Sequence, residues 1–154
     1  MNRPFCLQFV FILVSTVSLF SQGSPLAAQE PAPEDRARLE QQLQVLQKQI
    51  ADLKQNPEIK LPLLADVEVY AKAAEWILRH NEFYKPQYVK DTYQILETGR
   101  KRAQQLQIGK PEWTQQTGTV IFGYYSKIDG SVQPYALTFP ADFKEKSSHR
   151  WPLH

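Results

Sequence analysis

The sequence predicts an α+β fold, in which an antiparallel helical hairpin packs on a two-stranded β-hairpin. A signal peptide and a short coiled-coil-like helix precede them. Three observations predict this order: an apolar run opens the chain, amphipathic segments follow it, and two aromatic-rich runs flank Asp129-Gly130 near the end. We expect five segments: a signal peptide (1–28), a Pro/Ala linker with an amphipathic heptad helix (29–57), the helical hairpin (58–110), the β-hairpin (111–143) and a truncated tail (144–154).

Residues 1–28 have the layout of a secretory signal peptide. A weakly positive start precedes an almost uninterrupted apolar run over residues 5–20, and small residues follow it. The run is short for a membrane span, so we expect cleavage after Gly23 or Ala28 and a secreted or periplasmic protein. The alternative is an uncleaved membrane anchor. Cys6 lies inside the signal, so the mature chain would depend on its core rather than on disulfides.

The helix expected over residues 34–55 carries a heptad seam. Its apolar residues are spaced by four and three in alternation: Leu39, Leu43, Leu46, Ile50 and Leu53. Asn56-Pro57 ends the helix. Two interpretations remain open. The seam supports weak homo-oligomerisation, or the helix is a solvated element that docks nowhere or folds back on its own domain. The predicted architecture treats it as facing solvent.

The next two helices are expected to form the helical hairpin. The first runs from Leu64 to His80, with Asp66 near its N-terminus as a cap or first-turn carboxylate and Asn81 as a left-handed terminator. Its predicted apolar stripe contains Val69, Ala73, Trp76, Ile77 and His80.

The second of the two helices opens at Pro86, and Gly109 follows its end as a cap. Its predicted stripe contains Tyr88, Thr92, Ile95, Gly99, Ala103 and Leu106. On that stripe Gly99 would allow another backbone to approach closely. Trp113, in the connection that follows, is predicted to bridge the helices and the β-hairpin.

The β-hairpin is predicted from two apolar runs that flank Asp129-Gly130, a signal for a two-residue loop. Such a loop pairs Tyr124 with Tyr135, and it also pairs Phe122 with Leu137 and Val120 with Phe139. Gly123 and Ala136 then lie side by side on the other face, with room for close packing.

Pro134 cannot donate a hydrogen bond, but this register puts it opposite Tyr125 at a non-hydrogen-bonded pair. We therefore expect an edge, or a break in pairing, on that side of the second strand.

Composition and motifs exclude several classes of function. Removal of Arg3 with the signal leaves basic and acidic residues nearly balanced, which argues against nucleic-acid binding and, after signal cleavage, against membrane binding. No serine lies in a G-x-S-x-G elbow, and no histidine has metal-ligand spacing. The basic run Arg100-Lys101-Arg102 is interpreted as an exposed helix face. We therefore predict no catalytic residue, no cofactor-binding residue, no metal ligand and no cofactor.

Several runs resemble secreted α/β-hydrolases of planctomycete-type bacteria, in the prolyl oligopeptidase and esterase-like family of serine hydrolases. The resemblance covers about residues 61–140, and its longest run is Gly123 to Tyr135, GYYSKIDGSVQPY. Further matching runs lie at residues 64–69, 74–80, 82–84, 116–118 and 139–140.

In that family this region precedes the catalytic domain and supplies the first antiparallel strands of its sheet. The resemblance therefore implies a hydrolase catalytic domain as partner. It also implies that the chain, which ends before the family's catalytic motifs, is inactive alone. The alternative is a small secreted interaction protein that associates with itself through residues 34–55.

Overall fold

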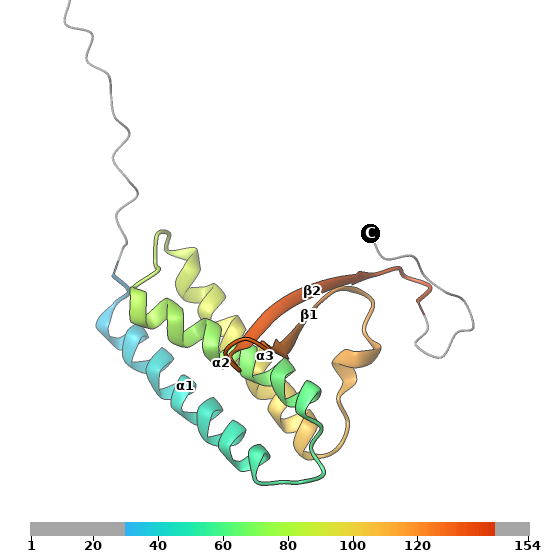
Figure 1. Cartoon of the computed structure of the whole chain (residues 1–154). Helices are drawn as coiled ribbons and strands as arrows, with labels where there is room; N and C mark the ends of the chain where they lie inside the picture. Colours follow the sequence, from blue (N-terminus) through green and yellow to red (C-terminus); the bar gives the residue numbers. More distant parts are fainter. Residues whose placement is uncertain (1–29, 144–154) are drawn as a thin grey trace, which may run out of the picture.

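The computed structural model describes residues 30–143, so the predicted signal peptide and tail lie outside the described residues. Three helices, α1 (Pro33–Lys54), α2 (Leu61–His80) and α3 (Gln87–Gln107), are followed by a 3-10 turn, η1 (Glu112–Gln115). Two antiparallel strands, β1 (Gly118–Tyr125) and β2 (Val132–Phe139), complete the α+β fold. Figure 1 shows the helices side by side, with the hairpin against α2 and extending away from the bundle.

The α1 helix is part of the core, which corrects the expectation of a solvent-facing helix. All five seam residues are buried, with Leu39 and Leu46 fully inaccessible, and they join one core cluster with α2 and α3. Each such side chain stabilises the fold by roughly 1.5–3 kcal/mol. Of the interpretations left open by the sequence, the structure therefore has the helix folded back on its own domain.

Close packing at Gly99 lets α1 and α2 approach α3. A Cβ atom on Gly99 would lie 2.7 Å from Leu46 Cδ2 and 2.9 Å from Tyr70 Cβ. The predicted close approach at Gly99 is confirmed, although the nearest atoms belong to side chains rather than to another backbone. On the same helix Thr92, Ala103 and Leu106 are buried as expected, whereas Tyr88 is exposed. Leu96, which the predicted stripe omits, is fully buried.

The predicted stripe of α2 is partly wrong: Val69 is buried and Ile77 packs against the core as expected, but two of its residues are exposed. Trp76 is 49% exposed and His80 is exposed, and their rings contact each other at the surface. The residues of α2 that enter the core are Leu64, Val67, Val69, Tyr70, Ala71, Ala74 and Leu78. A helix that covers α1 and α3 on one side and the hairpin on another needs a wider buried surface than one stripe provides.

The ends of the helices follow the predicted chemistry. Asn81 adopts the left-handed conformation after α2, with φ of 51°. Gly109 has φ of 71° after α3, and the Lys110 N–H reaches back to the Gln105 carbonyl. Trp113 is 1% exposed, which confirms its predicted place in the core.

The hairpin forms, but its predicted register is wrong by two residues. Phe122 pairs with Tyr135, Val120 with Leu137 and Gly123 with Pro134. The Ser126 N–H donates to Ser131 O at 2.8 Å and the Gly130 N–H to Ser126 O at 2.9 Å, which makes a four-residue loop over 127–130. A two-residue type I′ turn needs positive φ at both central residues, and only Gly130 has it here.

A shift of two residues leaves every side chain on its predicted face. Pro134 therefore still occupies a non-hydrogen-bonded pair, now opposite Gly123, and its missing N–H falls on the outer side of β2. The predicted space beside Gly123 is filled by α2, because a Cβ there would lie 2.1 Å from Ala65 O.

Candidate functional site

Two features could carry a function: a buried polar junction between the helices and β1, and an aromatic face on the hairpin. The junction consists of Asp66, Arg102, Trp113 and the β1 backbone at residues 121–123. Asp66, Arg102 and Trp113 are 4%, 5% and 1% exposed, respectively. The sequence suggested an N-terminal cap for Asp66 and an exposed helix face for Arg102, and both expectations are wrong.

Asp66 is buried because α2 begins at Leu61, so this residue lies in the second helical turn and faces β1. One carboxylate oxygen accepts the Gly123 N–H at 2.7 Å, and the other accepts the Trp113 indole N–H at 2.9 Å. Burial raises the pKa of Asp66, while these two hydrogen bonds and the positive charge of Arg102 oppose the rise.

Arg102 reaches the same strand from α3. Its Nη1 donates to Ile121 O at 2.7 Å and to Asp66 O at 3.2 Å. The guanidinium carbon lies 4.8 Å from the Tyr70 ring centroid and 5.1 Å from that of Trp113. Burial lowers the pKa of Arg102. The outer edge of β1, which a neighbouring strand could otherwise bond, is therefore occupied at the Gly123 N–H and the Ile121 carbonyl.

Further contacts along α2 hold the loop end of the hairpin. The Tyr125 hydroxyl donates to Glu68 at 2.7 Å, and Lys72 Nζ donates to Val132 O at 2.6 Å. Burial and the bond to Glu68 raise the pKa of Tyr125. Lys54 of α1 also pairs with Glu68. The hairpin is therefore fixed to α2 at successive points, and α1 joins the same network.

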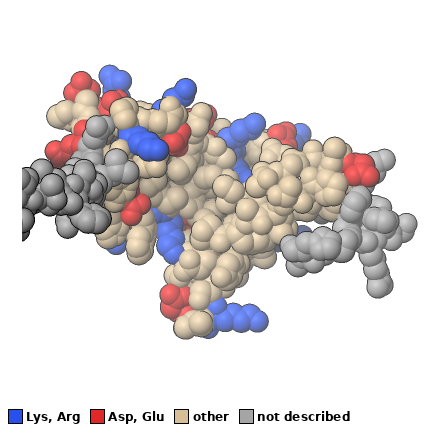
Figure 2. Space-filling view, turned by 90° about the horizontal axis from the view of Figure 1, so that it is seen from above, with Lys and Arg blue, Asp and Glu red and all other residues tan. Residues whose placement is uncertain are grey.

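The other face of the hairpin carries aromatic rings. Phe122 and Tyr135 stack with their centroids 5.5 Å apart, Tyr124 meets Tyr135 edge-on at 6.0 Å, and Phe139 contacts both Phe122 and Phe143. Tyr124 and Tyr135 remain 50% and 42% exposed. Charged side chains in Figure 2 gather mainly over the helical end, and a broad uncharged surface extends from there toward the grey residues on the right.

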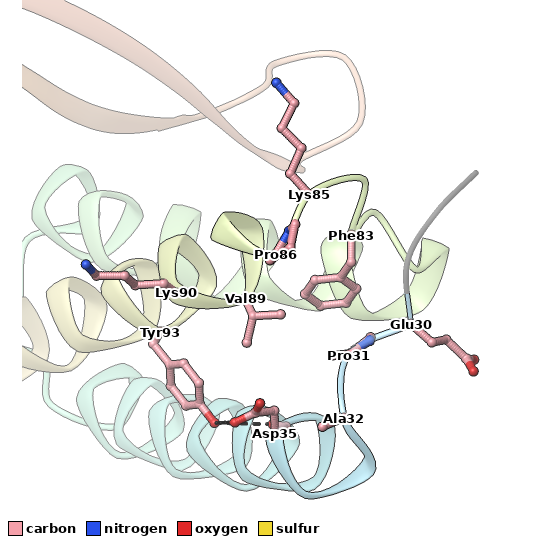
Figure 3. Close-up of a pocket in the computed structure, with 10 residues that line it drawn as sticks. All are labelled: Glu30, Pro31, Ala32, Asp35, Phe83, Lys85, Pro86, Val89, Lys90 and Tyr93. Atoms are coloured by element: carbon pink, nitrogen blue, oxygen red, sulfur yellow. Dashed lines mark hydrogen bonds between the residues drawn. The ribbon is translucent and has the colours of Figure 1, made fainter. Parts of the chain in front are cut away.

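An open cleft of about 460 Å³ lies between the beginning of α1 and the segment that leads into α3 (Figure 3). Tyr93 and Asp35 point toward each other across it, with the hydroxyl 3.1 Å from Asp35 Oδ1, whereas Lys85 and Lys90 extend away. The cleft therefore brings no set of charged groups together.

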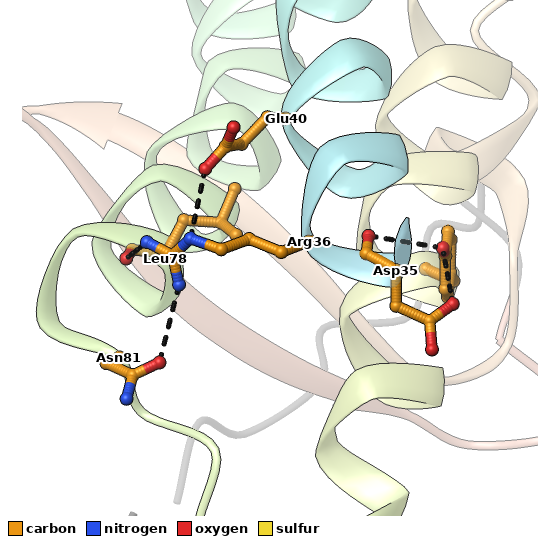
Figure 4. A network of polar contacts seen from close by, with 6 residues as sticks. Asp35, Arg36, Glu40, Leu78 and Asn81 are labelled. Carbon is orange, nitrogen blue, oxygen red and sulfur yellow. Dashed lines mark hydrogen bonds and ion pairs between the residues drawn. The ribbon is translucent and has the colours of Figure 1, made fainter. Parts of the chain in front are cut away.

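On another side of α1 from Asp35, Arg36 fixes this helix to the C-terminal end of α2 (Figure 4). Its Nη2 donates to Leu78 O at 2.9 Å, and its Nε lies 3.2 Å from Glu40 Oε1. A guanidinium at the carbonyl end of a helix is favoured by the helix dipole. Together with the Asp35–Tyr93 bond, this contact docks α1 on both other helices.

Catalytic chemistry is not assembled in residues 30–143. No group of three His, Cys, Asp or Glu residues there could hold a metal ion. Ser131 Oγ contacts the Asp129 carboxylate at 2.9 Å, but within an exposed loop, and His80 is exposed at the end of α2. No helix of this part of the chain is long and apolar enough to cross a membrane. Ser147, Ser148, His149 and His154 lie outside the described residues.

Comparison with protein-family models, characterised proteins and solved structures gives no match to this chain. The resemblance to secreted hydrolases, the partner that it implies and the export predicted from residues 1–28 therefore stay predictions.

Proposed function

We propose that this chain is an exported segment related to the N-terminal region of α/β-hydrolase serine hydrolases, and that it has a docking role rather than a catalytic one. The sequence of the hairpin, Gly123 to Tyr135, is the basis of the relationship. In this proposal β1 and β2 form the rim of a larger sheet, whose remainder belongs to a hydrolase catalytic domain.

The observation that carries the proposal is a difference between the two faces of the hairpin: the helices cover one face, and the other is partly exposed. The outer edge of β1 is occupied by Asp66 and Arg102, and α2 covers the face around Gly123. The opposite face exposes about half of Tyr124 and Tyr135. Exposed aromatic surface of this kind is typical of docking sites.

The outer edge of β2 also supports growth of the sheet on that side. The Val132 carbonyl already accepts a hydrogen bond from Lys72, and Pro134 has no N–H group to donate. Beyond Pro134, the backbone groups of Ala136 and Thr138 point away from β1, since both residues occupy non-hydrogen-bonded pairs. Pairing with a third strand would therefore begin at Ala136.

Two experiments test the proposal. The DNA beyond codon 154 is read in all three frames for an H-G motif and a G-x-S-x-G motif, which the proposal expects to find there. The purified chain is then assayed for hydrolysis of short-chain nitrophenyl esters, and no turnover above buffer is expected. Absence of both motifs would contradict kinship with a hydrolase, and ester turnover by the chain alone would contradict the non-catalytic role.

Self-association through residues 34–55 has less support, because the seam residues are buried against α2 and α3 of the same chain. A dimer through Leu39, Leu43, Leu46, Ile50 and Leu53 would require α1 to leave α2 and α3. Sedimentation equilibrium at rising concentration tests this alternative, because a strict monomer at high concentration would eliminate it.

A further inference from the structure

We propose that Asp66, Arg102 and Gly123 form a docking key that allows the helices to accept the hairpin in one position only. The key combines a polar condition, set by Asp66 and Arg102, with a steric condition, set by Gly123. It goes beyond the proposed function, because it applies whether or not the hairpin joins a larger sheet.

The polar condition follows from the hydrogen bonds that the side chains of Asp66 and Arg102 can make. An ionised carboxylate only accepts hydrogen bonds and a guanidinium only donates them. On the outer edge of β1, Asp66 meets the Gly123 N–H and Arg102 meets the Ile121 carbonyl. Both charged groups are at least 95% buried, so a mismatch at either would leave a charge without its hydrogen-bond partner.

A slide of the hairpin by one residue breaks the polar condition. Phe122 and Tyr124 belong to hydrogen-bonded pairs, so their N–H and C=O groups point toward β2 rather than toward the helices. With either residue in the place of Gly123, Asp66 has no donor and Arg102 has no acceptor on β1. Such a slide also exchanges the two faces of the hairpin.

A slide by two residues satisfies the polar condition but breaks the steric one. It places Ile121 or Tyr125 where Gly123 now lies. A Cβ at that position is 2.1 Å from Ala65 O and 2.5 Å from Ala65 C, both of them backbone atoms that no change of rotamer can move. Only the register with glycine in this place meets both conditions.

Amide hydrogen exchange on the full chain, measured residue by residue by NMR, tests the key. In the wild type, the Gly123 amide should exchange as slowly as the Tyr124 amide, which is bonded within the sheet. Asp66→Asn keeps the shape but removes the charge, and it cannot accept hydrogen bonds at both positions. We expect Gly123 to lose at least about tenfold in protection relative to Tyr124, because a hydrogen bond to a charged group is lost.

Tyr125→Phe is the matched control, since it removes the bond to Glu68 between the same two elements and leaves the key intact. It should leave the ratio of Gly123 to Tyr124 protection unchanged. An unchanged ratio in Asp66→Asn, or an equal loss in Tyr125→Phe, would overturn the proposal. If Asp66→Asn does not fold, amide exchange in the wild type tests the proposal instead. A Gly123 amide that exchanges as fast as the exposed Lys127 amide would overturn it.

Gly123→Ala tests the steric condition separately. Because the new Cβ must push β1 away from Ala65, the amide at position 123 should lose protection relative to Tyr124 here as well. Full protection of that amide in a folded Gly123→Ala variant would show that the close approach does not select the register.

Discussion

Gly123→Ala adds one methyl group at the closest approach between the helices and the hairpin. The added carbon would lie 2.1 Å from Ala65 O and 3.1 Å from Asp66 N, whereas ordinary contact begins at 3.4 Å. Relief requires β1 to move away from α2, which costs about 1–3 kcal/mol for overpacking. The same movement stretches the buried bond from the Gly123 N–H to Asp66, which is worth about 1.5–3 kcal/mol. Together the two terms predict a loss of about 2.5–6 kcal/mol.

Urea unfolding followed by far-UV circular dichroism measures this loss. Ala136→Gly, the reverse exchange at an exposed position of β2, is the matched control and should cost about 0.5–1 kcal/mol. If Gly123→Ala were within about 1 kcal/mol of the wild type, the tight contact with Ala65 would not exist in solution, and the reasoning would be refuted.

Three further predictions concern the helices and Asp66. Leu46→Ala should cost about 2–5 kcal/mol at every protein concentration, whereas Val45→Ala, at an exposed position, should change stability little; a concentration-dependent melting temperature would indicate instead that the seam joins two chains. Arg36→Gln should lower stability by about 0.5–1.5 kcal/mol, because it loses the hydrogen bond to Leu78 O. The control Arg38→Gln, at an exposed position, should cost about 0.5 kcal/mol or less. Equal urea midpoints for the two variants would show that the bond from Arg36 to α2 does not stabilise the fold. Burial raises the pKa of Asp66 above 3.8, so the folded protein holds this proton more tightly than the unfolded chain does. The resulting stabilisation of the folded state is fully present below pH 3.8 and is lost as the pH rises through the folded pKa. Relative to Asp66→Asn, the wild type should therefore lose stability as the pH is raised from below 3.8 in urea titrations, and a gain would mean that the hydrogen bonds outweigh burial.

Local chemistry accounts for what the sequence predicts correctly. Asn81 and Gly109 end their helices in left-handed conformations, and the position of Gly99 on a stripe identifies a close approach. The faces of the hairpin were also predictable, because alternation along a strand is unaffected by a register error of two residues. The loop itself was not, since Asp129-Gly130 is compatible with two-residue and four-residue loops, and hydrogen bonds around Ser126 favour the longer one.

The errors concern residues whose role depends on contacts distant in sequence. Leu39 and Leu46 have the same spacing whether their helix meets a second chain or its own domain. The docking contact that decides between these, Arg36 to Leu78, joins residues 42 positions apart. Asp66 and Arg102 also look like ordinary surface residues, because nothing local indicates that the edge of β1 will lie against both of them. The sequence signals for the junction were Gly123, a glycine within a strand pattern, and Trp113, an aromatic residue in the connection before β1.

The central claim is that the three helices and the β-hairpin form one cooperatively folded body, held together at the buried junction. A variant with Trp76→Phe and Trp151→Phe leaves Trp113 as the sole tryptophan, and its indole contacts Asp66 at that junction. Urea unfolding followed by Trp113 fluorescence and by helical circular dichroism should give coincident transitions. A fluorescence transition complete at a urea concentration where the helical signal is still intact would contradict the claim.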